Sequence, residues 1–252
     1  MTNVNSAFTN ALLADAAYVM GLTSASNLAV DLRPRMTPEL AAHIAKNFSV
    51  VTQIETGGLS SFDATVWRAN TASGAVNPNG MLYVTMRGTQ ETADFLVDIN
   101  LAVTGSAQAQ LVSMVNWWFK ISTPAGQSAT QIRTNIGGGM IGQFFEAAPP
   151  VLGTGLISAS NLIGGIEVNG HSLGGYLSSA FTRLFGNQGN VAHTSALNSA
   201  GFAPGSEAVF TQLQNLIGVS YGLGRFPSQA EQTNYFAKHG LNVTTNSFWF
   251  SH

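Results

Sequence analysis

Apolar residues recur every three or four positions in two segments near the start of the chain. In residues 5–22 this spacing predicts an opening helix. Residues 38–48 form the second periodic segment. Pro38 suits the first position of a helix, and Thr37 immediately before it can accept a hydrogen bond from the first turn as N-cap. The chain is therefore predicted to begin with two helices.

Alternation of polar and apolar side chains replaces the helical spacing after residue 47. Residues 48–56 and 61–70 alternate and are rich in Val, Thr and Phe, which predicts two antiparallel strands joined through Gly57-Gly58. The Asn-Pro-Asn-Gly sequence at 77–80 predicts a turn. The apolar residues 81–86 that follow this turn predict a further strand in the centre of a sheet.

The later part of the chain has weaker patterns. We expect residues 101–165 to be irregular, with Gly137-Gly138-Gly139 and Pro149-Pro150 interrupting regular structure. Because there is no internal repeat or low-complexity linker, residues 1–252 are predicted to form a single domain. Segments typical of a strand, a helix and a strand then occur at 193–200, 207–216 and 233–237.

The most informative segment is the sequence Gly-His-Ser-Leu-Gly-Gly at positions 170–175. Residues 165–169 before it are typical of a short strand, and residues 175–185 after it have one apolar helical face. A serine at the apex of a sharp strand-to-helix turn is the nucleophile elbow of α/β-hydrolases. The flanking glycines permit a strained backbone there. We therefore predict Ser172 as a catalytic nucleophile; the alternative is a tight turn without chemistry.

Composition argues against several classes of function. Charged residues make up only 9% of the chain, the net charge is −2, and no cluster of Lys or Arg occurs, so no nucleic-acid partner is predicted. The absence of cysteine excludes disulfides, thiolate zinc sites and thiol catalysis. No histidine pair has metal-ligand spacing with acidic support, and neither a metal nor a cofactor is predicted. We expect the few charges to be scattered over the surface.

Acyl transfer by a serine also needs donors for the developing oxyanion. The backbone N–H of Leu173 follows the nucleophile at the start of the next helix and can point into the site. A second donor is expected from the loop after an earlier strand. Here strand 81–86 leads into Arg87-Gly88-Thr89, which makes this loop the candidate.

Together, Met86-Arg87-Gly88-Thr89 and the 170–175 elbow resemble the two signatures of the class 3 lipase family. This family contains the fungal triacylglycerol lipases and related bacterial lipases and phospholipases. Phe95 and Asp98 match an aromatic residue and an aspartate of the family at their spacings from Thr89, and residues 198–202 are similar to its next strand. The resemblance covers about residues 75–250.

The resemblance implies an α/β-hydrolase fold, an α/β architecture in which helices flank a mostly parallel central sheet. It also implies the composition of the oxyanion hole: Thr89, through its hydroxyl and backbone N–H, together with the N–H of Leu173. By the same match Arg87 and Asp98 are structural.

A lid is the third feature that the resemblance implies. In the family, the segment after the oxyanion strand folds over the active site and moves at a lipid interface. Residues 99–126 match it as an apolar, lid-like insertion rich in aromatic side chains. The alternative is that Trp117 and Trp118 of this segment simply pack in the core.

The general base and its acid partner are not identified by the sequence. In this fold they follow the nucleophile, acid first and histidine last. No aspartate occurs after Asp98, and the family's acid position falls at residues 238–242, where no acid stands. Either the base lies beyond residue 252 in a longer protein, which we favour, or an irregular set serves. The acids and histidines for such a set are Glu207, Glu231, His193, His239 and His252, of which His193 comes too early in the chain to be the base.

We expect a carboxylic ester hydrolase that acts on lipid esters, as a triacylglycerol lipase or phospholipase, through a serine acyl-enzyme. Its partners would be a water-insoluble ester and, transiently, a membrane or lipid surface. The alternative is a non-catalytic lipase-like module that binds lipid or a partner. The N-terminus does not resemble a Sec signal peptide. The resemblance, low charge and absence of cysteine favour secretion without one, with a cytoplasmic location left open.

Overall fold

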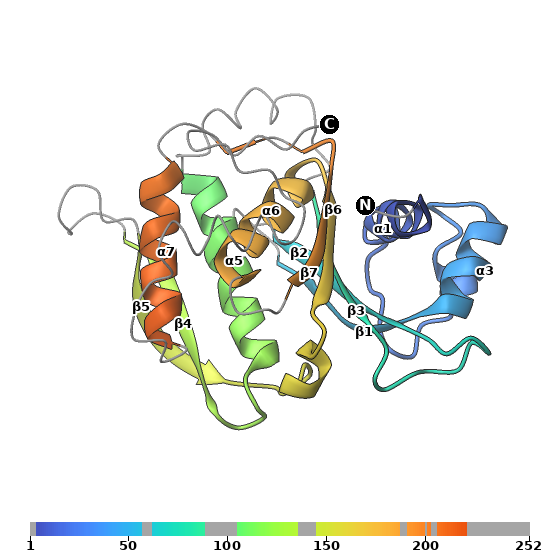
Figure 1. Ribbon diagram of the computed structural model, residues 1–252, viewed down its shortest axis with the longest axis horizontal. Coiled ribbons are helices and arrows are strands. Elements are labelled where there is room, and N and C mark those ends of the chain that lie inside the picture. Colours follow the sequence, from blue (N-terminus) through green and yellow to red (C-terminus); the bar gives the residue numbers. More distant parts are fainter. Residues whose placement is uncertain are drawn as a thin grey trace.

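The structure is a computed structural model of the 252-residue chain. It describes residues 4–56, 62–88, 105–135, 145–186, 191–199, 201–202 and 206–220. Figure 1 shows the described elements in layers, with a twisted sheet in the middle and helices on both sides of it. The candidate nucleophile lies at one end of this sheet, so the sheet and its two faces decide the geometry around it.

The central sheet contains, among the described residues, five strands in the order β1-β2-β3-β6-β7. β1, β2 and β3 pair as antiparallel neighbours, whereas the β3–β6 and β6–β7 pairs are parallel. β3 thus occupies the middle, as predicted for residues 81–86. A mixed sheet of this kind between helices agrees with the predicted α/β class. The bounds are Phe48–Glu55 for β1, Asp63–Ala69 for β2, Leu82–Arg87 for β3, Ile166–His171 for β6 and Val191–Leu197 for β7.

One face of the sheet is covered by helices from the start of the chain. Here α1 (Val4–Ala16) packs against β6, α3 (Pro38–Asn47) packs against β1, and the short α2 (Leu28–Asp31) packs on α3. This layer has its own apolar core, in which Trp67 of β2 is fully buried. The N-terminal segment is therefore part of the fold rather than an appendage.

On the opposite face, α6 (Leu173–Phe185) packs directly on β3, β6 and β7. α5 (Gly105–Ser122) and α7 (Ser206–Ser220) pack against α6 on this side of the sheet (Figure 1). Strand alternation divides the side chains between the two faces. Val84 and Val168 enter the core under α5 and α6, whereas Glu167, next to Val168 in the chain, points toward α1. The predicted strand at 193–200 and helix at 207–216 correspond to β7 and α7.

The helix predicted at residues 38–48 is confirmed. α3 starts at Pro38, and the side chain of Thr37 accepts a hydrogen bond from the N–H of Leu40, as expected of an N-cap. The turn predicted at 77–80 is also confirmed, since the N–H of Gly80 donates to the carbonyl of Asn77 over 2.9 Å.

Replacing Thr37 with alanine should lower the free energy of unfolding by about 1 kcal/mol, because the N–H of Leu40 loses its acceptor. Urea unfolding of the variant would measure this loss. Thr37→Asn is the matched control, since asparagine also caps helices and should leave the stability nearly unchanged. Equal losses in both variants would contradict a capping role.

The opening helix is shorter than predicted. α1 ends at Ala16 rather than near residue 22. The side chain of Gln53 on β1 binds the next segment instead: its amide oxygen accepts from the N–H of Leu22, and its amide nitrogen donates to the carbonyl of Val19. Contacts to the sheet thus override the apolar periodicity of this segment.

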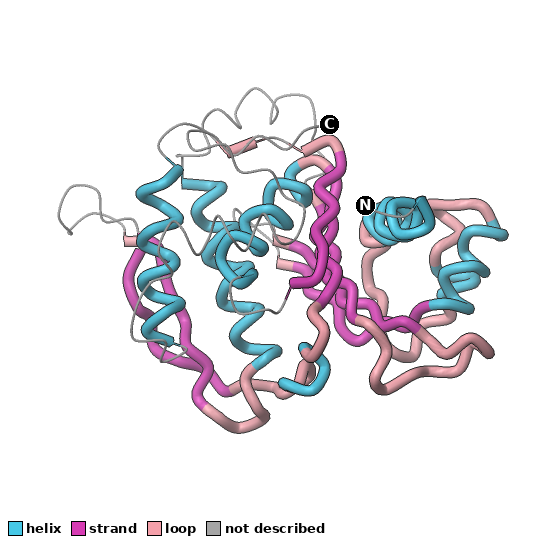
Figure 2. The backbone as a smooth tube through the Cα atoms, viewed as in Figure 1, coloured by secondary structure: helices cyan, strands magenta, loops and turns pink. Residues whose placement is uncertain are grey.

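The expectation of irregular structure at 101–165 is wrong. This region contains α5, a hairpin of β4 (Ser128–Thr134) and β5 (Phe145–Leu152), and a short 3-10 helix at Ala159–Leu162 (Figure 2). Pro149-Pro150 lies inside β5, where the pairing skips a residue between Ala129 and Gln131 of β4. Proline is tolerated at such a bulge and on an edge strand, because neither requires its missing N–H.

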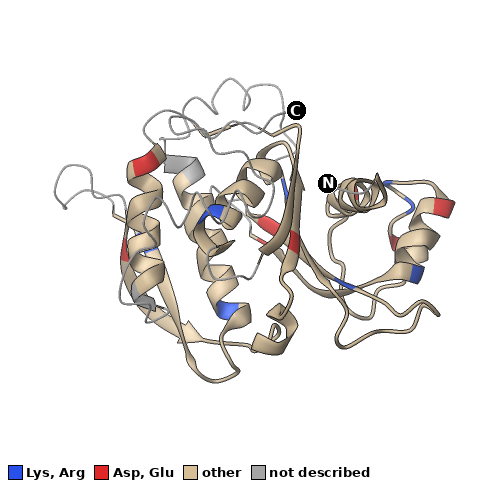
Figure 3. Ribbon diagram, viewed as in Figure 1, with Lys and Arg blue, Asp and Glu red and all other residues tan. Residues whose placement is uncertain are grey.

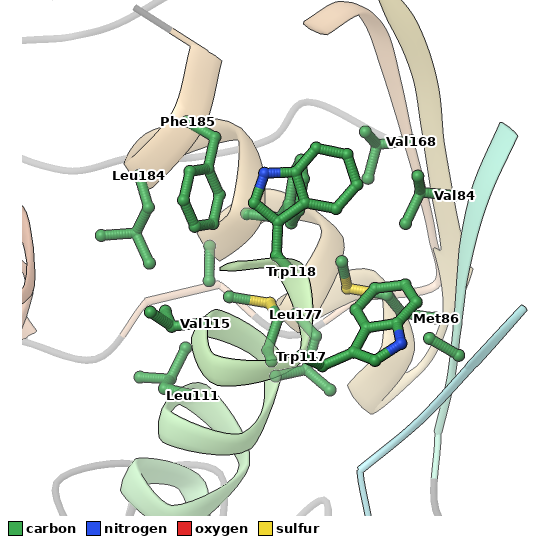
Figure 4. Packing of buried hydrophobic residues seen from close by; sticks show 14 of the residues in the cluster. Val84, Met86, Leu111, Val115, Trp117, Trp118, Val168, Leu177, Leu184 and Phe185 are labelled. Carbon is green, nitrogen blue, oxygen red and sulfur yellow. The ribbon is translucent and has the colours of Figure 1, made fainter. Parts of the chain in front are cut away.

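The described part of the lid-like segment, residues 105–126, favours the alternative interpretation. α5 packs against α6, with Trp118 fully buried and Trp117 only 5% exposed (Figure 4). The indole of Trp118 meets the ring of Phe181 edge to face, with 4.8 Å between ring centroids. These side chains form the core beneath the sheet, so we interpret α5 as a core helix; residues 99–104 lie outside the described residues.

Charged residues are sparse over the described chain, as Figure 3 shows. They are not all scattered surface groups, which corrects the expectation from composition. Arg87 and Asp63 form a nearly buried ion pair at 2.5 Å. Arg183 is buried within α6 and reaches Glu207 of α7 at 2.6 Å. In the part of the chain that the structure describes, no helix has the length and apolarity needed to span a bilayer.

Candidate active site

Ser172 occupies the sharp turn between β6 and α6. Its backbone angles are φ 56° and ψ −123°, a region that residues other than glycine rarely enter. The turn is fixed on both sides. The N–H of Ser172 donates to the carbonyl of Leu197 on β7, and its own carbonyl accepts from Gly175. The predicted strand–turn–helix with serine at its apex is therefore present.

The glycines of the elbow allow the turn to pack against the end of β3. A Cβ on Gly170 would stand 2.7 Å from the carbonyl oxygen of Met86, and one on Gly174 would stand 2.8 Å from the carbonyl carbon of the same residue. On the other side, a Cβ on Gly175 would meet the Cβ of Ser199 at 2.7 Å. Each distance is too short for a real side chain, so close approach accounts for all three glycines.

The Ser172 side chain is available for chemistry. Ser172 is partly exposed, and its hydroxyl makes no hydrogen bond to any described residue. Directly after it, Leu173 is the first residue of α6, where a backbone N–H has no acceptor within the helix. The positive end of the helix dipole is at the same point. The elbow thus presents a free hydroxyl beside a free N–H.

The loop after β3 reaches the elbow, as the oxyanion hypothesis requires. A Cβ on Gly88 would lie 3.3 Å from the backbone nitrogen of Leu173 and 2.9 Å from the carbonyl oxygen of His171. Gly88 and Leu173 are 85 positions apart in the chain yet are neighbours in space. Thr89, the proposed second donor, lies outside the described residues, as do Phe95 and Asp98.

Sequence reasoning missed a group of side chains from the N-terminal layer beside this loop. The hydroxyl oxygen of Tyr18 would lie 3.1 Å from a Cβ on Gly88. The guanidinium of Arg35 lies over the Tyr18 ring, 4.6 Å from its centroid, and Arg87 hydrogen-bonds the sulfur of Met20. No local pattern marks Tyr18 as a site residue, because its contact to Gly88 spans the fold.

Tyr18 and Asp63, the carboxylate paired with Arg87, both have shifted pKa values. Burial raises the pKa of the Tyr18 hydroxyl, and the Gly88 N–H and the charges of Arg35 and Arg87 offset this only in part. Tyr18 is therefore neutral near pH 7. Burial also raises the pKa of Asp63, against the opposing effect of its partner Arg87.

His193 forms a separate polar cluster under α1. Its Nδ1 lies 3.1 Å from Oε2 of Glu167, and the amide of Asn10 donates to the same carboxylate over 3.0 Å. In the β6–β7 register His193 stands opposite Glu167, five residues before Ser172. Five strand residues span about 16 Å, so His193 is too far away to be the general base. This distance agrees with the sequence-based prediction that His193 is not the general base.

The pKa of Glu167 makes this cluster sensitive to acid. Burial by itself raises the pKa, but hydrogen bonds from His193 and Asn10 and the charge of His193 together hold it below 4.5, its ordinary value. A carboxylate with a lowered pKa stabilises the folded state above its unfolded pKa. That contribution is lost as the pH falls through the folded pKa.

Urea unfolding from pH 7 to pH 3 should show this effect. At neutral pH Glu167→Gln should be less stable than wild type, and the difference should shrink as the pH falls below about 4.5. Glu146→Gln is the control, because Glu146 forms only an exposed pair with Arg133. A difference between wild type and Glu167→Gln that stays constant with pH would refute the assignment.

The other candidates for base and acid are not at the elbow. Glu207 pairs with Arg183, eleven residues beyond Ser172 and therefore about 16 Å along α6. Glu231, His239 and His252 lie outside the described residues. Among the residues with described positions, no three His, Asp or Glu side chains are close enough together to hold a metal ion.

Comparison of the chain with protein-family models, curated proteins and solved structures finds no match.

Proposed function

We propose that the protein is a carboxylic ester hydrolase of the α/β-hydrolase type, with Ser172 as its nucleophile. The observation that supports this most directly is the backbone of Ser172, a non-glycine residue at φ 56° between a parallel strand and a helix. Strain of this kind concentrates at functional sites, where surrounding contacts maintain it. A structural turn would place a glycine at this position without cost.

In the proposed reaction the Ser172 oxygen attacks the ester carbonyl carbon, and a base removes the hydroxyl proton. The carbonyl oxygen becomes an oxyanion that accepts hydrogen bonds from the N–H of Leu173 and from Thr89. The tetrahedral intermediate collapses, and the alcohol leaves with the proton from the base. Water then hydrolyses the acyl-enzyme by the same route, which releases the acid and restores Ser172.

Lipid esters are the proposed substrates on the strength of the motif resemblance. The Gly-His-Ser-Leu-Gly-Gly elbow and the Met-Arg-Gly-Thr segment resemble the two class 3 lipase signatures, and their described parts lie side by side in the fold. The proposed partner is a lipid surface that presents the ester. We also propose that the enzyme acts outside the cell, where such substrates are accessible.

A fluorophosphonate probe tests the proposed nucleophile, because it phosphonylates only an activated serine. Mass spectrometry of the labelled chain should place the adduct on Ser172, and Ser172→Ala should not label. Ser158→Ala removes an exposed hydroxyl far from the elbow and should label like wild type. Absence of labelling in folded wild-type protein would reject the hydrolase assignment.

A non-catalytic lipase-like module that binds lipid or a partner is the second candidate. One observation favours it: among the described residues, no histidine or carboxylate is hydrogen-bonded to Ser172. Without a base the serine hydroxyl is a poor nucleophile. Under this hypothesis the chain would bind vesicles containing a long-chain ester, would not hydrolyse the ester, and would not react with the probe.

A further inference from the structure

The space beside the elbow is bordered by one side chain from the N-terminal layer, Tyr18. Its hydroxyl oxygen and the backbone nitrogen of Leu173 lie 3.1 Å and 3.3 Å from the same point, the position of a Cβ on Gly88. Gly88 itself is buried. The Tyr18 hydroxyl thus faces the backbone of Gly88 beside the N–H of Leu173, the proposed oxyanion donor.

The segment that contains Tyr18 is held firmly against the sheet. The N–H of Gly21 donates to Oε1 of Glu55 over 2.6 Å, and the N–H of Leu22 donates to Oε1 of Gln53 over 2.7 Å. These strand side chains fix the backbone three and four residues after Tyr18. A hydroxyl mounted on this segment can therefore hold a neighbouring loop in place.

The ring of Tyr18 is fixed as well. Arg35 lies over the ring and pairs with Asp15 at 2.8 Å. The guanidinium of Arg87 is 6.0 Å from the ring centroid and is itself held by Asp63. The ring therefore has cationic groups on strands and loops of both layers around it, which limits its movement relative to Gly88.

From this geometry we propose that Tyr18 is a positioning residue of the oxyanion hole. Its hydroxyl contacts the backbone of Gly88 and so holds the end of β3 in register with the N–H of Leu173, the described donor of the hole. The inference rests on the proposed function of Ser172. It assigns to the N-terminal layer a role that neither sequence motif contains.

Tyr18→Phe tests the proposal by removing one oxygen atom. Hydrolysis of p-nitrophenyl butyrate should show kcat lowered about 10- to 100-fold with KM changed less than about twofold, because oxyanion contacts strengthen in the transition state. Inhibition by a boronic acid should weaken by a similar factor, because its tetrahedral adduct with Ser172 also places an oxygen in the hole. The melting temperature should stay close to that of wild type.

Tyr83→Phe is the matched control. Tyr83 lies at the other end of β3, packs on Phe48, and its hydroxyl has no hydrogen bond among the described residues. This variant should keep wild-type kcat and boronate affinity. Tyr18→Phe matching Tyr83→Phe in both quantities would overturn the inference, as would a fall in kcat without a fall in boronate affinity.

Gly88→Ala approaches the same contact from the loop and keeps Tyr18 intact. The added Cβ would stand between the Tyr18 hydroxyl and the Leu173 nitrogen, and it would lie 2.9 Å from the His171 carbonyl oxygen. A parallel fall in kcat and boronate affinity is expected. If Tyr18→Phe does not fold, unchanged values in Gly88→Ala would overturn the inference.

The experiments distinguish a failure of the proposed hydrolase function from a failure of the proposed role of Tyr18. Wild-type protein that neither hydrolyses esters nor reacts with a fluorophosphonate overturns the proposed function, and the role of Tyr18 with it. An active wild type whose Tyr18→Phe variant has normal kinetics overturns only the role of Tyr18.

Discussion

Replacing Ser172 with alanine is expected to lower kcat for p-nitrophenyl esters about a million-fold. The change removes only the oxygen that forms the acyl-enzyme. Alanine keeps the Cβ and the same backbone strain at φ 56°, and the hydroxyl makes no hydrogen bond that folding requires. The melting temperature of the variant should therefore match that of wild type.

Initial rates with p-nitrophenyl butyrate, together with circular dichroism, measure both parts of this expectation. Ser158→Ala, an exposed change distant from the elbow, should retain full activity. Activity retained by folded Ser172→Ala would assign the nucleophile elsewhere and remove the basis for the hydrolase proposal.

The largest effect on stability is expected at Trp118. Its side chain is fully buried between α5 and α6 and contacts the rings of Phe181 and Phe185. Trp118→Ala should lower the free energy of unfolding by about 3–5 kcal/mol, because it removes this burial and leaves a cavity. Single domains are typically stable by about 5–15 kcal/mol, so much of the total would be lost.

Urea unfolding followed by circular dichroism measures the loss, and Phe8→Ala is the control. Phe8 lies on α1, is 50% exposed, and touches His43 at its edge. Its replacement should cost less than about 1 kcal/mol. A lid helix would give a different result: Trp118→Ala would then change activity on lipid without a comparable loss of stability.

Local sequence signals predicted those elements whose own residues determine them. Local residues mark where each of these elements begins or ends. Examples are the cap at Thr37 and Pro38, the alternating strands around residues 48–70, and the elbow at 170–175. α5 was missed because its first turn contains a glycine and no acidic side chain, so no local signal marks where the helix begins. Its aromatic residues suggested a lid, although the same apolar character also suits a helix whose aromatic side chains are buried in the core.

The site could be predicted only in part, for a similar reason. Ser172 and Leu173 are adjacent in the chain, so one motif identifies both. Gly88 was found through a second motif, but its neighbour Tyr18 comes from a different layer, and no spacing rule links the two. Contacts between distant segments depend on sheet order and helix placement, which local patterns do not determine.

Two long-range hydrogen bonds of Asn10 have a consequence for biosynthesis. Asn10 donates to Glu167 and accepts from Asn169, partners 157 and 159 positions later in the chain. At translation rates of 5–20 residues per second, β6, the strand that α1 binds, is synthesised roughly ten to thirty seconds after α1. During that interval its apolar side is open to chaperones, and the nascent chain should be most vulnerable to proteases there. α1 can therefore take its place on the sheet only after β6 has been synthesised.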